Sequence, residues 1–202
     1  MKLYYSPGTC ALASHIILRE TNTKAALVKT DIKSKTFEGG GDFRKINPHG
    51  YVPALELDDG TVLLESPSIL QYIADKAGRT TVAPAAGTTA HYKMLSWLTF
   101  VSSELHGPFG TLWNGAMPDA AKAIARDKLA ARFKYIDTHF AANPYLMGTD
   151  FTLPDSYLFA VMGWAPMLNV DVSGYPNLQA YTARVAARPA VQTAMREEGL
   201  IK

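Results

Sequence analysis

Short apolar segments alternate with a helix-like segment in the first third of the chain. Residues 2–5 (KLYY) and 25–32 (AALVKTDI) are typical of buried strands. Between them, apolar side chains at positions 12, 13, 16 and 17 give residues 10–20 the spacing of one helix face. The pattern predicts a strand, a helix and a second strand, which is the beginning of an α/β arrangement.

A hairpin and a second helix are expected next. Residues 53–57 (PALEL) and 61–64 (TVLL) flank an Asp-Asp-Gly sequence, which is a strong turn signal. Residues 66–78 predict a helix with Ser66 as its N-cap and Gly78 at its end. Together these elements predict a mixed sheet of about four strands with helices packed on it.

The rest of the chain has only helical patterns. A segment rich in Gly, Pro and Thr comes first, and we expect a linker over 79–87 between a small α/β domain (1–78) and an all-helical domain (88–202). Thr152 and Asp155 stand three residues apart, which predicts a capping box. Four helices are expected, the last of them ended by Pro189: 90–113, 119–142, 152–168 and 177–188.

Composition and charge exclude several classes of protein and of site. The 202 residues carry a net charge of +2 from interspersed acidic and basic residues, which is too small and diffuse for a nucleic-acid surface. No apolar stretch approaches the ~18 residues of a membrane span, and we expect a cytoplasmic protein. The five His are scattered and the single Cys has no partner, so neither a metal site nor an internal disulfide is expected.

Cys10, the only cysteine, follows a Pro-Gly pair at the predicted start of the first helix. A lone cysteine is often a small core residue. At a helix N-terminus, however, unpaired N–H groups and the helix dipole favour a thiolate, which predicts a reactive thiol. Ala13 occupies the position of the second cysteine in a C-x-x-C pair, so redox chemistry at Cys10 would need a thiol from another molecule.

Two further segments are suited to bind a ligand's backbone and a carboxylate. Pro53 cannot donate to a sheet, so the N–H and C=O groups of Val52 can turn outward. Glu65 and Ser66 stand at a predicted helix N-terminus, where N–H groups and a hydroxyl can hold a carboxylate. The alternatives are an ordinary N-cap at Ser66 and a solvated charge at Glu65.

Polar residues also share one face of the predicted helix 90–113. Thr99, Ser103 and His106 fall within roughly 60° of one another, beside an apolar stripe. A solvated face is the alternative interpretation. His15 stands ~140° around its helix from the cysteine, so the two side chains point apart and we interpret His15 as structural.

Aromatic pairs at helical spacing are candidates for the wall of an electrophile pocket. Phe109 and Trp113 are four residues apart, and Tyr157 and Trp164 are seven apart, so each pair shares a helix face. The alternative for each of the four is a place in the ordinary core.

Five segments of the chain resemble, in order and spacing, the bacterial beta-class glutathione S-transferases. They are YYSPGTCALASHIILRE (4–20), NPHGYVPALEL (47–57), LESPSILQYIAD (64–75), TFVSSELH (99–106) and RPAVQTAMREEGLIK (188–202). The resemblance implies a thioredoxin-like N-terminal domain, an all-helical C-terminal domain, a homodimer and glutathione as cosubstrate.

The resemblance also implies where glutathione binds. It places Cys10 and His106, the expected catalytic residues, near the glutathione sulfur. It pairs Val52 with the cysteinyl amide and makes the Val52–Pro53 peptide bond cis. The expected glutathione-binding residues are Cys10, Lys35, Val52, Pro53, Glu65, Ser66, Thr99, Ser103, Glu104 and His106.

The two ends of glutathione are assigned in the same way. Glu65 and Ser66 hold the γ-glutamyl end, and Lys35 faces the glycyl carboxylate. Glu104 is expected to meet the γ-glutamyl amine, either in its own chain or across the dimer. Thr99 stands where these enzymes often carry Asn, which is a departure from the family pattern.

The expected function is transfer of the glutathione thiolate to small hydrophobic electrophiles. One alternative is a glutathione-dependent thiol–disulfide oxidoreductase or peroxidase that uses Cys10 as a monothiol. The other is a non-enzymatic binding protein with a transferase-like fold.

Overall fold

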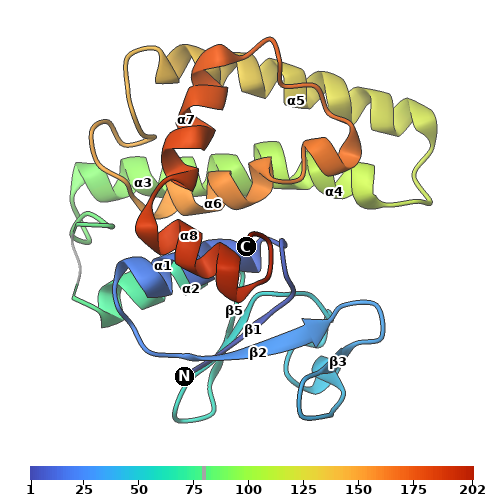
Figure 1. Ribbon diagram of the computed structural model, residues 1–202, viewed down its shortest axis with the longest axis vertical. Coiled ribbons are helices and arrows are strands. Elements are labelled where there is room, and N and C mark those ends of the chain that lie inside the picture. Colours follow the sequence, from blue (N-terminus) through green and yellow to red (C-terminus); the bar gives the residue numbers. More distant parts are fainter. Residues whose placement is uncertain (79–80) are drawn as a thin grey trace.

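The computed structural model describes residues 1–78 and 81–202, so the first two residues of the expected linker 79–87 lie outside the described residues. The N-terminal part contains a five-stranded sheet in the order β3-β2-β1-β4-β5 (Figure 1). β1 pairs with β2 in parallel and with β4 antiparallel, and β4 and β5 form the predicted hairpin. The elements are β1 (Lys2–Tyr5), α1 (Ala11–Glu20), β2 (Ala26–Asp31), β3 (Thr36–Phe37), η1 (Phe43–Lys45), β4 (Ala54–Glu56), β5 (Val62–Leu64) and α2 (Ser66–Lys76).

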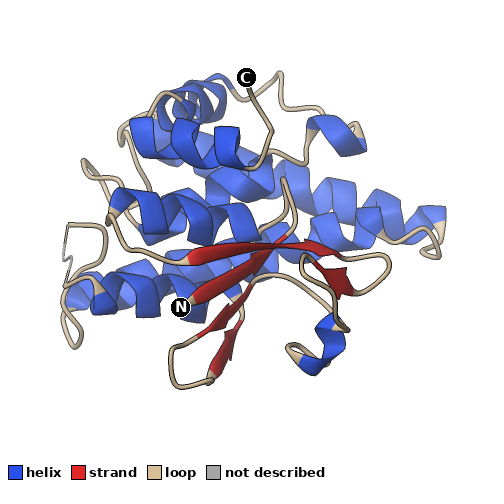
Figure 2. Cartoon of the chain, turned by 60° about the horizontal axis from the view of Figure 1, so that its bottom comes forward, coloured by secondary structure: helices blue, strands red, loops and turns tan. Residues whose placement is uncertain are grey.

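Side chains on the central strands alternate between two apolar clusters, because successive residues of a strand point to opposite faces. Leu3 of β1 lies opposite Leu55 of β4, and both belong to the large core that includes α1 and α2. Tyr4 and Ala54 face the other way, where Phe43 of the short helix η1 joins them. The longer helices therefore gather on one face of the sheet (Figure 2).

The mixed sheet confirms the predicted architecture, with two local corrections. The count of four strands was wrong because β3 has only two residues, too few to carry a period. Ser66 is not the N-cap of α2: the helix begins at Ser66, and Glu65 is the N-cap residue with φ of 69°. A positive φ at a residue with a Cβ costs on the order of 1–3 kcal/mol and is often found at functional sites.

The C-terminal part is all-helical, as predicted. Its capping box is confirmed, because the Asp155 carboxylate accepts hydrogen bonds from both the N–H and the hydroxyl of Thr152, each at 2.9 Å. The elements are α3 (Thr89–Phe100), the π-helical segment η2 (Val101–His106), α4 (Gly107–Trp113), α5 (Asp119–Phe140), α6 (Leu153–Met162), η3 (Pro166–Leu168), α7 (Pro176–Ala186) and α8 (Pro189–Glu197).

Apart from shifts of one or two residues at helix ends, the helices differ from the sequence prediction in three places. The helix expected over 90–113 is one continuous run, but its middle is π-helical, which changes the angular spacing of the residues it contains. The helix expected over 152–168 ends at Met162 and is followed by a separate turn of 3₁₀ helix. Pro189 does not only end a helix: it also begins α8, because proline suits the first turn of a helix.

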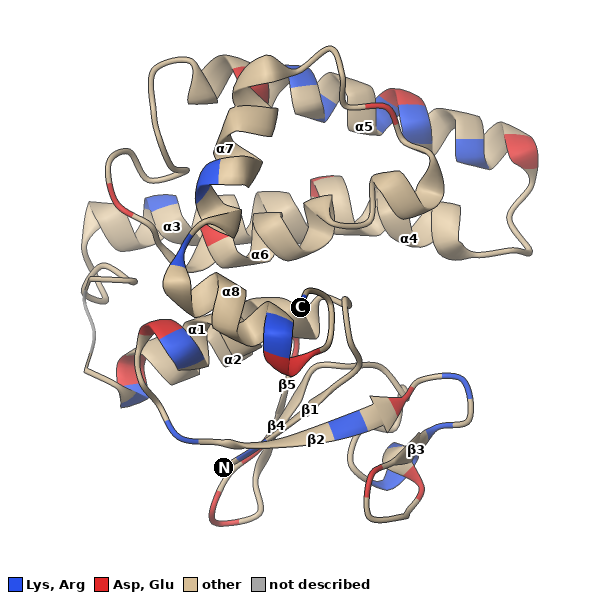
Figure 3. Cartoon of the chain, viewed as in Figure 1, with Lys and Arg blue, Asp and Glu red and all other residues tan. Residues whose placement is uncertain are grey.

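The two parts share one core. α1 packs against α6 and α8, and α8 lies beside α1 in Figure 1. The indole N–H of Trp164 donates a 2.8 Å hydrogen bond to the carbonyl of Gly8, and the Arg188 guanidinium binds the Glu20 carboxylate at 2.6 Å and 3.0 Å. Charged residues of both signs are spread over both parts (Figure 3). None of the helices in the described ranges is long and apolar enough to cross a membrane.

Candidate functional site

A cavity of about 930 Å³ lies where the two parts of the chain meet. Its N-terminal wall consists of the loop after β1, the end of β2, the loop before β4 and the first residues of α2. Its C-terminal wall consists of the ends of η2 and α4 together with residues of α6 and the turn that follows. Nine of the residues expected from the sequence line it: Cys10, Val52, Pro53, Glu65, Ser66, His106, Trp113, Tyr157 and Trp164.

Cys10 lies at the N-cap of α1 with its side chain buried. Its Sγ atom is 3.3 Å from the carbonyl oxygen of Val52 and donates a hydrogen bond to it. Burial raises the pKa of the Cys10 thiol to about 12, although the Ser66 hydroxyl and nearby backbone N–H groups act in the opposite direction. The burial of this side chain opposes the thiolate expected at this helix N-terminus, because removal from water outweighs the helix-terminus effect.

The residues just before and just after the β4–β5 hairpin line the cavity. The Val52–Pro53 peptide bond is cis, as the resemblance implied. Glu65, with its positive φ, and the buried Ser66 stand at the N-terminus of α2. A helix N-terminus with a hydroxyl at its first residue is suited to bind a carboxylate.

His106 comes from the end of the π-helical segment and is partly buried. Its Nδ1 atom lies 2.6 Å from the hydroxyl of Tyr157, which α6 supplies. Burial lowers the pKa of His106, so the imidazole is neutral at neutral pH. The His106 ring also meets the indole of Trp164 edge-to-face, with the ring centroids 4.9 Å apart.

Trp113 and Phe109, two of the four aromatic residues expected to line the electrophile pocket, differ in their exposure. Trp113 lines the cavity and is 48 % exposed. Phe109 does not line it: the residue is fully buried and packs against Phe133 and Trp164. The four-residue spacing put both on one helix face, but the adjacent helix α5 covers Phe109 and leaves Trp113 at the open end.

Four other expected glutathione-binding residues do not line the cavity. Lys35 donates through Nζ to the carbonyl of Gly50 at 2.9 Å. Thr99 and Ser103 are exposed on the outer side of α3 and η2. The carboxylate of Glu104 binds two cations of α5, Arg132 at 2.6 Å and Lys128 at 3.2 Å, and the Arg132 and Lys128 partners lower the pKa of Glu104.

Several residues of the cavity wall were not predicted from the sequence. Lys33, His49, Tyr51 and Met167 line it, and Tyr51 and Met167 are largely exposed. No periodic pattern marks these positions, since Lys33, His49 and Tyr51 lie in loops and Met167 lies in the three-residue helix η3. Pro48 and Gly50 on either side of His49 were the available signal, because they mark a turn leading to the Val52–Pro53 bond.

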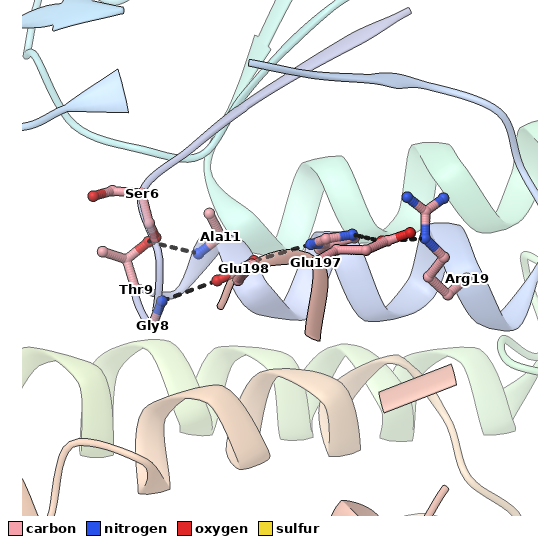
Figure 4. A network of polar contacts seen from close by, with 8 residues as sticks. Ser6, Gly8, Thr9, Ala11, Arg19, Glu197 and Glu198 are labelled. Atoms are coloured by element: carbon pink, nitrogen blue, oxygen red, sulfur yellow. Dashed lines mark hydrogen bonds and ion pairs between the residues drawn. The ribbon is translucent and has the colours of Figure 1, made fainter. Parts of the chain in front are cut away.

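The C-terminal segment holds the loop that precedes Cys10 (Figure 4). The buried carboxylate of Glu198 accepts a hydrogen bond from the Gly8 N–H at 2.9 Å and contacts His15 Nδ1 at 3.0 Å. Glu197 contacts the other ring nitrogen of His15 at 2.6 Å and accepts a hydrogen bond from Arg19 at 2.7 Å. His15 thus has a structural position, as interpreted from the sequence, and its partners come from the other end of the chain.

Two family models match the two parts of the chain. The N-terminal domain of glutathione S-transferases matches residues 8–76, and the C-terminal domain of glutathione S-transferases matches residues 88–189. The chain belongs to the glutathione S-transferase family. The transferase GstA of Escherichia coli O157:H7 is 38% identical to this transferase over 99% of this chain and 100% of the relative.

Solved structures give the class. A beta-class glutathione S-transferase of Sphingomonas chungbukensis superposes with a TM-score of 0.95 at 42% identity, with 100% of both chains covered. A sphingomonad glutathione S-transferase solved in complex with glutathione superposes with a TM-score of 0.94, also at 42% identity and with 100% of both chains covered. The predicted resemblance to beta-class transferases is confirmed. In the described part of this transferase, no three or more His, Cys, Asp or Glu side chains gather in a way that could hold a metal ion.

Proposed function

We propose that the protein binds glutathione in this cavity and transfers its thiolate to small hydrophobic electrophiles. The observation that carries the proposal is one cavity bounded by Cys10, by Ser66 at the N-terminus of α2 and by His106. The glutathione complex of the sphingomonad relative supports glutathione as the ligand. The aromatic side chains of Trp113 and Trp164 on the opposite wall support an apolar electrophile.

Glutathione is proposed to lie across the N-terminal wall. Its γ-glutamyl carboxylate binds the Ser66 hydroxyl and the N–H groups of α2, with Glu65 beside its amine. The backbone of Val52, next to the cis Pro53, pairs with the cysteinyl amide. This arrangement brings the glutathione sulfur between Cys10 and His106.

Both proposed catalytic groups act as neutral hydrogen-bond donors to the glutathione sulfur. A free thiol with a pKa of ~8.5 is only ~3% ionised at pH 7, and lowering its pKa by ~2 units needs about 2.7 kcal/mol. Hydrogen bonds to a charged group contribute roughly 1.5–3 kcal/mol each. One bond from the Cys10 S–H, which turns from the Val52 carbonyl to the glutathione sulfur, and one from His106 are therefore sufficient to make thiolate the main form.

The two alternative functions have less support. Disulfide exchange requires a thiolate at Cys10, whereas burial raises the pKa of this thiol to about 12. A protein that only binds ligands has no need of two proton donors facing one cavity. The alternatives predict mixed-disulfide reduction or glutathione binding without turnover, respectively.

We also propose that the protein is a homodimer. Thr99 and Ser103 are exposed on one side of α3 and η2, which suits a symmetric contact in which each chain completes the partner's glutathione site. Glu104 is held next to them by α5. Sedimentation at micromolar concentration is expected to give twice the 22.0 kDa chain mass, and a species of single-chain mass alone would contradict the dimer.

Three further assignments belong to the same proposal. The domains are 1–78 and 88–202, joined by the linker 79–87, which is consistent with the family models over 8–76 and 88–189. Lys35 remains a candidate for binding the glycyl carboxylate. Its Nζ atom lies over the ring of Tyr51, 5.3 Å from the ring centroid. A cytoplasmic location is proposed because glutathione is the thiol of reducing compartments.

The test is a kinetic assay with glutathione and 1-chloro-2,4-dinitrobenzene, followed by calorimetry of glutathione binding. Ser66→Ala is expected to weaken binding by about 1–3 kcal/mol, because a carboxylate loses a buried hydroxyl donor. Ser68→Ala on the exposed side of the same helix is the matched control and should bind normally. Absence of conjugation with every electrophile in a panel, despite bound glutathione, would refute the proposed activity.

A further inference from the structure

Tyr157 carries a hydroxyl group that the apolar wall of an electrophile pocket does not need. Tyr157 is only 2% exposed, and its oxygen is 2.6 Å from Nδ1 of His106. The two rings meet edge-to-face, with their centroids 5.9 Å apart and an angle of 82° between their planes. A phenylalanine would supply the same apolar ring, so the hydroxyl itself calls for an explanation.

The two environments fix the charge of each group and allow this hydrogen bond two directions, one for each tautomer of the imidazole. Burial raises the pKa of Tyr157 far above 10, so its hydroxyl keeps its proton. Burial lowers the pKa of His106, so the imidazole is neutral and has one N–H donor and one acceptor nitrogen. With Tyr157 donating to Nδ1, the ring proton is on Nε2.

The opposite tautomer would be unsuited to the proposed reaction. If Nδ1 carried the proton and donated to the Tyr157 oxygen, Nε2 would present a lone pair to the cavity. A lone pair repels a thiolate, whereas an N–H stabilises it. Among the described residues Nε2 has no hydrogen-bond partner and is not one of the buried unpartnered atoms, and His106 lines the cavity, so this nitrogen can meet a ligand.

We propose that Tyr157 is a positioning residue, whose hydroxyl fixes His106 in the Nε2–H tautomer and aims that N–H at the sulfur of bound glutathione. Trp164 restricts the ring from another side, with centroids 4.9 Å apart and planes at 70°. The inference rests on the proposed function, because it assigns a role to Tyr157 in activating the same thiol.

Tyr157→Phe removes the hydroxyl and keeps the ring. The pKa of the glutathione thiol in the complex, followed by its ultraviolet thiolate absorbance, should rise by about one unit. kcat/KM for conjugation near pH 6.5 should fall about tenfold, and the loss should shrink as pH rises, with the glutathione KM nearly unchanged. Tyr175→Phe is the matched control, since its hydroxyl bonds the Ala130 carbonyl at 3.1 Å outside the cavity.

Two further measurements separate positioning from other roles. In a His106→Ala background, Tyr157→Phe should cause no additional loss, because its effect passes through the imidazole. Nitrogen-15 NMR of the wild-type protein should show His106 protonated on Nε2 alone, and Tyr157→Phe should mix the two tautomers. The NMR readout does not need turnover, so it tests the pairing even if the proposed transferase activity fails.

Three results would overturn the inference. The first is a wild-type His106 protonated on Nδ1. The second is an equal loss from Tyr157→Phe with and without His106, which would mean that the hydroxyl acts directly on a substrate. The third is an unchanged pH profile and an unchanged tautomer in Tyr157→Phe.

Discussion

The rate of disulfide exchange at Cys10 measures how strongly burial lowers the reactivity of the only thiol of the chain. The side chain is buried at the N-cap of α1, and burial raises its pKa to about 12. The measurement uses an aromatic disulfide, dithiodipyridine, whose reduction releases a coloured thione. With a single cysteine in the chain, the colour reports this site alone.

The expected rate follows from the thiolate fraction. Relative to an ordinary thiol of pKa ~8.5, a pKa near 12 lowers the thiolate fraction at pH 7 about 3,000-fold. A more basic thiolate is a better nucleophile, and a Brønsted slope of ~0.4–0.5 restores roughly 40-fold of this loss. The native protein should therefore react about a hundredfold more slowly than the same protein unfolded in urea.

The pH dependence of the exchange rate shows whether the pKa of Cys10 is raised or lowered. The rate in the native protein should keep rising through about pH 10, where an ordinary thiol of pKa ~8.5 has levelled off. Cys10→Ala should abolish the colour and retain part of the conjugation activity, because His106 remains as a donor. A native rate within threefold of the urea rate at neutral pH, or a midpoint below about pH 8, would show that the thiol is activated and refute the reasoning.

Three other variants test the site and its support. Lys33→Ala should weaken glutathione binding at least as much as Lys35→Ala, by up to about 1 kcal/mol, because Lys33 lines the cavity; calorimetry showing a loss only for Lys35→Ala would contradict this. Glu198→Ala should lower the free energy of unfolding by about 1–3 kcal/mol, because the Gly8 N–H loses its acceptor, and an unchanged urea midpoint would argue against the role. Asp155→Ala should destabilise the protein by about 2–4 kcal/mol in urea unfolding, since its carboxylate accepts bonds from Leu146 as well as Thr152, and a normal midpoint would exclude it as a folding contact.

Local signals fixed most of the elements correctly because their causes are local. The Asp-Asp-Gly turn sits between β4 and β5, and the pairing of Thr152 with Asp155 lies at the start of α6. Where the cause is not local, prediction failed. β3 exists only because two residues reach β2. The nine residues of α8 form a stable helix because they pack on α1, since so short a helix is marginal by itself.

The candidate site divides in the same way. Residue type and position identified Cys10, Ser66 and His106, since each chemistry requires a thiol, a helix N-terminus or an imidazole. The direction in which a side chain points depends on its neighbours. Spacing alone therefore could not separate Phe109, which is in the core, from Trp113, which lines the cavity.

By itself, the sequence determined the order of the longer elements up to α7, the division into an α/β part and a helical part, the family, and the residue types available for catalysis. Only the tertiary structure decided the protonation states of these catalytic side chains. Helix-terminus effects on Cys10 are local and favour a thiolate, whereas burial depends on segments far apart in the chain and raises its pKa to about 12. Likewise, Tyr157 meets His106 across 51 positions of sequence, so the tautomer of that imidazole is set by packing and not by any motif.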